Sequence, residues 1–275
     1  MKLLTAVYFG SASFTPAAQR RALRHFVCLF AAGDWSANTP ATCGVALLMR
    51  DGKCAVARAA VSPAAFSAQP RFRNVLAAVD GNAVAVLGYG SGNGDADPRA
   101  AALQPTQWET TVGLCAADLT NAEAVVADLG WSPEVPSPPA LLLRLVNEAF
   151  AESTGASLMP AVAARLRLAE GPFVVVAWDR RTPETLIVAR AGGDIFAFAD
   201  EATGVVHFSN RPSLAAGLLQ GIGAVPDLAD NTLRRYDPSS FLEPESVALF
   251  PPPWPAPLRP SRRRPEPAGA TPARP

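Results

Sequence analysis

"GPFVVVAWDRRTPETLIVARAGGDIFAFADEATGVVHFSN", residues 171–210, is the stretch that decides the fold. It holds successive apolar runs rich in valine, isoleucine and phenylalanine, residues that favour strands. Short segments containing Pro, Gly, Thr or Asp separate these runs, as expected of turns. Connections this short join antiparallel neighbours, because a parallel crossover needs about a dozen residues or more. The stretch therefore predicts a series of antiparallel strands.

Outside this stretch, helices and strands alternate. Residues 3–9 predict a buried strand, and Pro16 begins a helix that Gly33 ends. Asp51-Gly52, between apolar runs at 43–50 and 54–61, predicts a hairpin. The other expected elements are a helix at 72–79, a strand at 83–89, a strand, turn and helix within 112–131, and helices at 138–153, early in 158–171 and at 213–220. This order favours an α+β fold with antiparallel sheets and external helices.

Composition excludes several classes of protein. The 275 residues are 49% apolar, which is enough for a sizeable core, and the formal net charge is zero. No basic excess argues for nucleic acid or a membrane surface as a partner. No run of 18 apolar residues predicts a transmembrane helix. The four cysteines form no C-x-x-C pair and lie at no metal-ligand spacing from His25 or His207. We therefore expect no metal, no cofactor and a cytoplasmic protein with reduced thiols.

Residues 171–220 resemble the second half of the glutamine amidotransferase domain of asparagine synthetases, which is a class II domain. That family has a Gly, a strand ending in Trp-Asp or Tyr-Asp, a strand ending in Ala-Arg-Asp, and a strand that places Phe-Ala-Ser-Glu before a helix. The matching residues here are Gly171, Trp178, Asp179, Ala189, Arg190, Phe208 and Ser209. Two positions depart from the pattern, because Ala191 replaces the Asp and Asn210 replaces the Glu.

The resemblance extends over roughly residues 80–250, and the lasso-peptide cyclases of this family look nearest. It implies the N-terminal-nucleophile hydrolase fold, a four-layer αββα sandwich of two antiparallel sheets. Residues 1–250 would form this domain. The Pro- and Arg-rich residues 251–275 have no apolar period and are expected to be a disordered tail.

For an active member, the resemblance implies an N-terminal Cys whose own α-amine is the base, and an Asn-Gly pair that stabilises the oxyanion. Ala116-Ala117 occupy the Asn-Gly position here, and Asn121 retains the Asn that closes the same loop. The expected Arg and Asp that hold glutamine are replaced, with Gly90 and Pro138 near their positions. Arg190 is a candidate substrate contact, although an anchoring role in the sheet is the stronger expectation. Neither histidine is expected to be a base.

Two registers are open for the nucleophile. In one, Cys43-Gly44 matches the family's Cys-Gly start, and residues 1–42 are a propeptide. In the other, MKLLTAVYFG is the first strand and Lys2 replaces the Cys. The first register preserves a possible nucleophile, and the second leaves none.

The preferred interpretation is a degenerate amidotransferase-like domain, a pseudoenzyme that serves amide-bond-forming machinery as a structural or recognition module. Its expected partners are a separate synthetase-type protein or a precursor peptide, since no S-G-G-x-D-S loop of a synthetase domain is present. The main alternative is an active glutaminase with Cys43 as its nucleophile. A weaker alternative is an interaction protein whose Pro-rich tail binds an aromatic groove.

Overall fold

The computed structural model describes residues 2–10, 15–31, 41–92, 104–132, 137–153, 155–200, 203–212, 215 and 228–251. The predicted helix at 213–220, except Ala215, and the tail after Pro251 lie outside the described residues. The predictions for these two segments therefore stay predictions.

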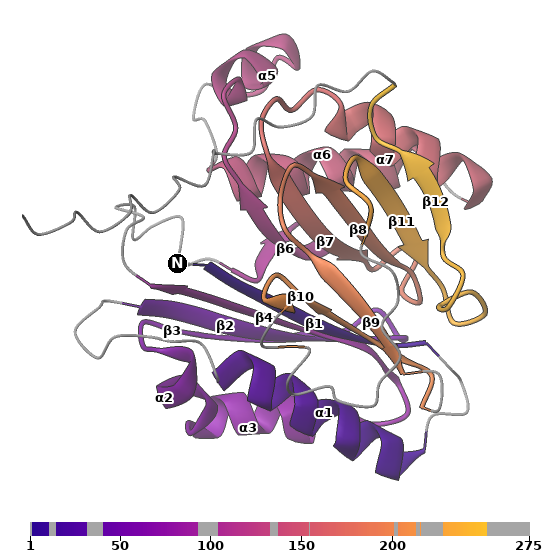
Figure 1. Cartoon of the computed structure of the whole chain (residues 1–275). Coiled ribbons are helices and arrows are strands. Elements are labelled where there is room, and N and C mark those ends of the chain that lie inside the picture. Colours follow the sequence, from indigo (N-terminus) through magenta and orange to yellow (C-terminus); the bar gives the residue numbers. More distant parts are fainter. Residues whose placement is uncertain are drawn as a thin grey trace, which may run out of the picture.

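Two six-stranded sheets, here called sheet A and sheet B, face each other (Figure 1). In order across sheet A, the strands are β3 (Cys54–Ala59), β2 (Ala41–Met49), β4 (Ala83–Gly92), β1 (Lys2–Phe9), β10 (Val205–Ser209) and β9 (Phe196–Asp200). In sheet B, they are β12 (Glu245–Ala248), β11 (Thr232–Tyr236), β8 (Leu186–Ala191), β7 (Phe173–Asp179), β6 (Thr111–Ala117) and β5 (Thr106–Trp108). Neighbouring strands in both sheets pair antiparallel.

Helices cover the outer face of each sheet (Figure 1). Sheet A is covered by α1 (Pro16–Ala31), α2 (Pro63–Ser67) and α3 (Pro70–Ala77). Sheet B is covered by α5 (Ala122–Asp128), α6 (Pro138–Glu152) and α7 (Leu158–Leu166), with a 3₁₀ turn at Gly155–Ser157 before α7. The predicted α+β, four-layer αββα sandwich is therefore confirmed.

Period-two alternation in the strands divides the core into three layers. On β1, Leu4, Ala6 and Tyr8 pack between the sheets. Val7 and Phe9 point the other way and pack against the α1–α3 layer. Both faces of β1 are buried because sheet B covers one and the helices α1–α3 cover the other. This burial explains why residues 3–9 form a continuous apolar run rather than an alternating one.

The Trp-Asp pair at the end of β7 holds a turn in place. Trp178 is fully buried, and its Nε1 donates to the carbonyl of Pro183, 2.7 Å away. Asp179 is also fully buried, and it accepts hydrogen bonds from the Arg181 backbone amide at 2.8 Å and from the Thr110 hydroxyl at 2.9 Å. These contacts close the β7–β8 turn, so a structural role is sufficient to explain the Trp-Asp pair.

Some elements differ from the sequence-based expectation. The sequence resemblance implies that residues 225–253 are a connector to a synthetase domain, but β11 and β12 add two strands to sheet B from within this segment. The residues of β12 are mostly exposed, so the sequence lacks the alternation of apolar and polar residues that would predict a strand. The short α2 and the three-residue β5 were not predicted either.

Candidate functional site

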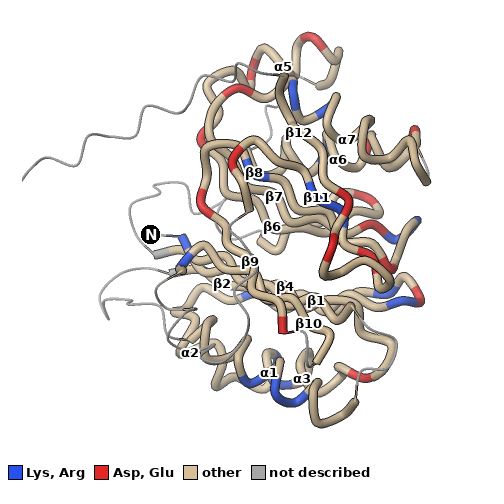
Figure 2. Tube along the Cα trace, turned by 45° about the vertical axis from the view of Figure 1, so that its right-hand side comes forward, with Lys and Arg blue, Asp and Glu red and all other residues tan. Residues whose placement is uncertain are grey.

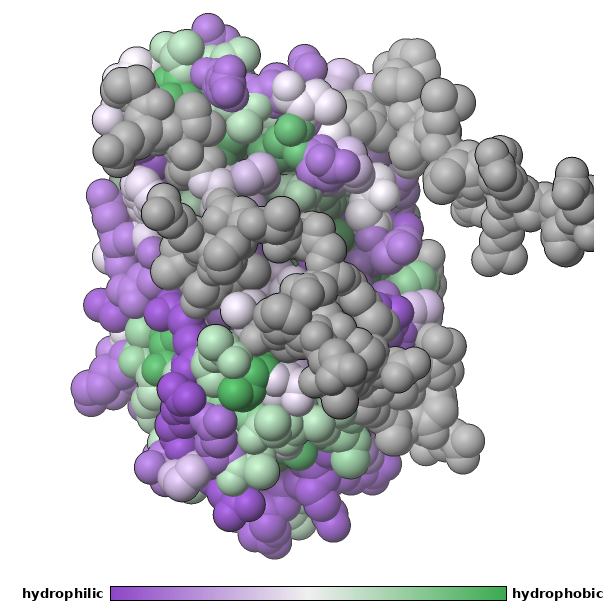
Figure 3. Space-filling view, turned by 90° about the vertical axis from the view of Figure 1, so that its left-hand side faces the viewer, coloured by the Kyte–Doolittle hydropathy of each residue, from purple (hydrophilic) through white to green (hydrophobic). Residues whose placement is uncertain are grey.

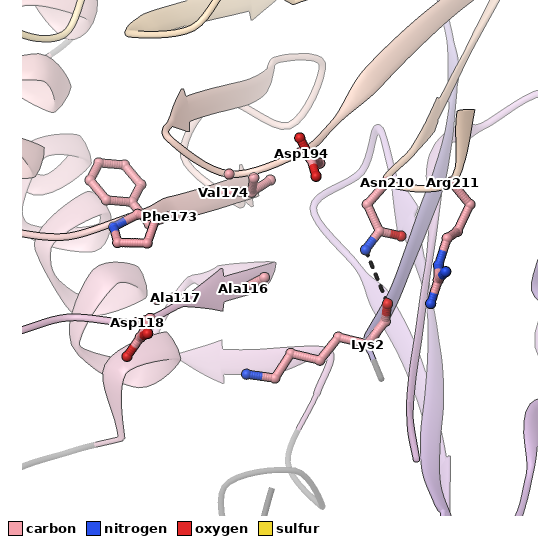
Figure 4. A pocket seen from close by; sticks show the side chains of 11 residues that line it. Lys2, Ala116, Ala117, Asp118, Phe173, Val174, Asp194, Asn210 and Arg211 are labelled. Atoms are coloured by element: carbon pink, nitrogen blue, oxygen red, sulfur yellow. Dashed lines mark hydrogen bonds between the residues drawn. The ribbon is translucent and has the colours of Figure 1, made fainter. Parts of the chain in front are cut away.

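One end of the space between the sheets holds a cavity of about 380 Å³. The start of β1, the end of β6, the β8–β9 loop and the residues after β10 surround it. Its polar lining residues are Lys2, Asp118, Asp194, Asn210 and Arg211, and Ala116 and Ala117 line it beside them (Figure 4). The resemblance implies the catalytic centre at this meeting of the first strand and the Asn-Gly loop.

Asn210 fixes the start of β1 beside the cavity. Its Oδ1 accepts from the Leu4 amide at 2.9 Å, and its Nδ2 donates to the Lys2 carbonyl at 3.1 Å. The Asn210 amide also donates to the Leu4 carbonyl at 3.2 Å. The Lys2 side chain extends from this anchored backbone towards the end of β6 (Figure 4). Lys2 therefore occupies the cavity-facing position at the start of the first strand.

Ala116 and Ala117 form the end of β6 and pair with Val174 and Phe173 of β7. Ala116 packs with the core between the sheets, and Ala117 packs with the core under α5–α7. At the position that would present an oxyanion-binding amide, the side chain facing the cavity is therefore a methyl group.

The loop after Ala117 keeps a fixed shape. The Asp118 amide donates to the Pro172 carbonyl at 3.0 Å, and the Thr120 amide donates to the Glu170 carbonyl at 2.9 Å. Gly171 has a φ of +116°, and a Cβ there would lie 2.2 Å from the Asp118 carbonyl oxygen. Only glycine fits this close approach of two backbone segments. The family-like glycine is thus explained by packing of the loop.

Asn121 also supports this loop and does not line the cavity. Its Nδ2 donates to the Leu168 carbonyl at 2.8 Å, and its Oδ1 accepts from the Glu170 amide at 2.9 Å. The side chain thereby joins the start of α5 to the segment before β7. Asn121 is a positioning residue for the loop that carries Asp118.

Arg190 anchors the opposite wall of the cavity. Its Nε donates to the Gly193 carbonyl at 2.7 Å, and its guanidinium also donates to the Leu228 carbonyl. The guanidinium lies 3.9 Å from the Asp194 carboxylate. These contacts hold the β8–β9 loop, which brings Gly193 and Asp194 to the cavity, so Arg190 acts on the site through that loop.

None of the four cysteines lines the cavity. Cys43 lies within β2, is 2% exposed, and packs in the core under α1–α3, on the face of sheet A that points away from sheet B. Its Sγ donates to the Val61 carbonyl at 3.2 Å, and burial raises the pKa of its thiol to about 12. Cys115 is buried under α5–α7, Cys28 is exposed on α1, and Cys54 begins β3.

The two histidines lie together, away from the cavity, between α1 and β10. The rings of His25 and His207 are 5.6 Å apart. Burial lowers the pKa of His207 to about 3, and it also lowers the pKa of His25. Each ring is therefore neutral at pH 7, and neither histidine is among the residues that line the cavity.

The charges of the cavity come from opposite walls. Lys2 and Arg211 belong to sheet A and the segment after it, Asp118 follows β6 of sheet B, and Asp194 lies in the β8–β9 loop that joins the two sheets. Sequence reasoning did not single out Asp118, Asp194 or Arg211. The sequence feature that could have identified them is their position directly after a predicted strand or in a turn between two strands. Such positions gather at the ends of the strands, where this cavity lies. Such an arrangement can bind a small charged molecule, but the described lining supplies no thiol.

Within the described ranges, no cluster of His, Cys, Asp and Glu could hold a metal ion. Among the same residues, no helix is long and apolar enough to cross a membrane.

Comparisons with solved structures identify the fold. Glutamine phosphoribosylpyrophosphate amidotransferase from B. subtilis, complexed with ADP and GMP, aligns over 90% of this chain and 49% of its own, with a TM-score of 0.59 and 11% identity. A structure described as the allosteric regulatory enzyme of purine biosynthesis aligns over the same shares, with a TM-score of 0.58 and 10% identity. The chain thus spans about half the length of these proteins. It has the N-terminal-nucleophile, glutamine amidotransferase-like fold that the sequence resemblance implied. No family model and no curated protein sequence matches the chain.

Proposed function

We propose that this chain is a glutamine amidotransferase-like domain without glutaminase activity, which acts as a structural or recognition module. The observation that carries the proposal is that Lys2 and Ala116 line the cavity at the positions of the nucleophile and the oxyanion-binding Asn. The reaction of the fold family needs a thiolate and a side-chain oxyanion donor at these places. An ammonium group and a methyl group stand there instead.

The expected loss of activity is large. Removing one oxyanion donor from an enzyme costs about 10²–10³ in rate. Loss of the nucleophile removes the covalent route altogether. The Ala117 backbone amide could still donate a hydrogen bond, but without a thiolate it has no tetrahedral intermediate to stabilise.

The position of Cys43 argues against the alternative, an active glutaminase that begins there. Removal of residues 1–42 would take away α1 and β1, and β1 lies between β4 and β10 in sheet A. The thiol also points into the core under α1–α3 rather than into the cavity. In the intact chain, burial raises the pKa of the Cys43 thiol to about 12, which disfavours the thiolate that a nucleophile needs.

A glutaminase assay tests the proposal. The purified chain is incubated with glutamine, released ammonia and glutamate are measured, and intact mass shows where the chain begins. We expect no ammonia above the protein-free blank and no loss of residues 1–42. Ammonia release from a chain that starts at Cys43, abolished by Cys43→Ala, would contradict the proposal and establish the alternative.

The finer proposal concerns the machinery that the module serves. The asparagine-synthetase and lasso-cyclase resemblance over residues 80–250 supports an amide-bond-forming system, with a separate synthetase-type protein or a precursor peptide as the partner. Co-purification of the tagged chain from its native source, followed by mass spectrometry, should recover an ATP-dependent ligase. Repeated recovery without any such ligase would refute this assignment.

A further inference from the structure

The zero net charge of the chain conceals a segregation of charge between its two helical layers. Helices α1 and α3 carry Arg20, Arg21, Arg24, Arg71 and Arg73, and no Asp or Glu occurs in α1, α2 or α3. All of these arginines are exposed. On the other side, α5–α7 carry four carboxylates, Glu123, Asp128, Glu148 and Glu152, against two arginines. Figure 2 shows the basic residues gathered on α1 and α3.

Most of this positive charge is not neutralised by contacts within the described chain. Arg21 lies 3.9 Å from the Asp200 carboxylate, which is its one ion pair there. Arg71 donates to neutral groups, the Gln69 side chain and the Arg58 carbonyl. The side chains of Arg20, Arg24 and Arg73 make no hydrogen bond or ion pair with any described residue. Exposed like charges at this density repel one another and attract an anionic partner.

An apolar groove runs along the same helix. Arg20, Leu23, Arg24, Val27 and Cys28 line a cavity of about 500 Å³ on the solvent side of α1. These positions lie on one side of α1, where the half-buried Leu23 and Val27 also contact the edge of the core formed by Ala22, Phe26 and Phe30. Leu23 and Val27, four residues apart, form the apolar floor, and the two arginines flank it.

We propose that this α1 groove docks an acidic amphipathic α-helix of a protein partner. The i, i+4 spacing of Leu23 and Val27 suits apolar side chains at the same spacing on a partner helix, as in helix-in-groove recognition. Carboxylates beside that apolar stripe would meet Arg20 and Arg24. This surface lies on the outer side of α1, away from the Lys2 cavity, so the inference goes beyond the proposed function and does not depend on it.

Other anionic partners fit the surface less well. A membrane-binding helix projects large apolar side chains into the lipid. Here the large aromatic residues of the layer, Phe26, Phe30, Phe66 and Phe72, are buried, and the groove is recessed. In Figure 3, the lower part of the molecule, where this layer lies, shows small apolar patches among hydrophilic residues. A nucleic acid would bind through its phosphates to the arginines, and this would leave the apolar floor of the groove without a role.

Cys28 gives a direct readout of docking, because it is exposed and lines the groove. The probe is a synthetic helical peptide of about 20 residues, with Leu at i, i+4 flanked by Glu and a thiopyridyl disulfide on a terminal cysteine. The Cys28 thiolate attacks the peptide sulfur, a mixed disulfide forms, and thiopyridone leaves. A second peptide carries Lys in place of every Glu. Intact-mass measurements over time give the rate of labelling, and tryptic peptide mapping identifies the labelled cysteine.

We expect the acidic peptide to label Cys28 about tenfold faster than the basic peptide at low salt, with the ratio falling as salt rises. Arg24→Glu should remove most of this preference. Lys53→Glu is the matched control, since this exposed turn residue pairs only with Asp51 among the described residues, and it should leave the rates unchanged. Leu23→Ser keeps every charge, and it should still slow labelling several-fold if the apolar floor contributes to docking. Thermal melts show that each variant is folded.

Three results would overturn the proposal. The first is equal labelling by the two peptides. The second is a preference that Leu23→Ser leaves intact, which would reduce the effect to charge attraction without a groove. The third is tighter, Arg24-dependent binding of phosphatidylserine vesicles or duplex DNA that displaces the acidic peptide, which would assign the surface to a lipid or a nucleic acid.

Discussion

At the scale of the residue, Asp179 is a buried carboxylate that remains charged. Burial raises the pKa of its carboxyl, but hydrogen bonds from Arg181, Thr111 and Thr110 outweigh this effect, so the pKa lies below its usual value. Arg181 also donates to the Asn147 carbonyl at 3.0 Å, which connects the β7–β8 turn to α6. Asp179 therefore holds Arg181 in the position from which it bonds α6, and this network connects sheet B to the helical layer.

We predict that Asp179→Ala lowers the free energy of unfolding by about 2–3 kcal/mol, because it removes the buried acceptor that Thr110, Thr111 and Arg181 share. Urea denaturation at pH 7 measures the change. Asp194→Ala is the matched control, since that carboxylate is 77% exposed and lies 3.9 Å from Arg190. Its loss should cost less than about 1 kcal/mol. Equal losses in the two variants would contradict a structural role for the Asp179 network.

At the scale of the element, the Asn210 side chain anchors the cavity end of β1, in addition to its pairing with β4. Asn210 bonds the backbone on both sides of Leu3, at the Lys2 carbonyl and the Leu4 amide. The resemblance to the synthetases places a Glu at this position. An Asn can donate and accept at once, whereas a carboxylate only accepts. The Asn that replaces the family's Glu can therefore anchor the backbone of β1 through both a donor and an acceptor, which a Glu could not do.

We predict that Asn210→Ala loosens the start of β1 without unfolding the sheet. Exchange of the Leu4 amide proton, followed by NMR, should accelerate about 10-fold or more, as expected from losing hydrogen bonds worth about 1 kcal/mol each. The Val7 amide, further along β1, should exchange at its original rate. A uniform acceleration along β1 would instead mean that Asn210 stabilises the whole strand.

How far the sequence predicts the structure varies between elements. Strands β7 to β10 were predictable because each is a compact apolar run that ends at a turn signal. β12 was not, since it is a four-residue strand of mostly exposed residues with no apolar run to mark it. The cavity was predictable at Ala116 and Ala117 through the family motif. Asp194 and Arg211 were not, because their proximity depends on how the two sheets face each other.

At the scale of the whole molecule, two neighbouring histidines connect the α1 layer to sheet A. His25 comes from α1 and His207 from β10, and neither Nδ1 has a hydrogen-bond partner among the described residues. The charged groups around them are Arg21 and Arg24 of α1 and Asp200 of β9. Burial is the main cause that lowers the pKa of His207 to about 3, with smaller contributions in the same direction from His25 and Arg21 and an opposing one from Asp200.

These values predict that the protein loses stability as the pH falls below that of an unperturbed histidine. Between pH 6.5 and about 3, the unfolded chain binds a proton at His207 and the folded chain does not, so the free energy of unfolding rises with pH in this window. The expected slope is about 1.4 kcal/mol per pH unit, which gives a loss of about 2 kcal/mol between pH 7 and pH 5.

Urea denaturation of the parent chain and of His207→Phe at pH 7, 6 and 5 tests this prediction. The variant keeps a buried ring but has no group to protonate, so most of the slope should disappear. A smaller slope from His25 should remain, because the pKa of that ring is lowered in the same direction. Asp179 contributes little between pH 7 and pH 5, since the stabilisation from a carboxylate with a lowered pKa is lost mainly below about pH 4. An unchanged slope in His207→Phe would show that the layers are not coupled through this ring.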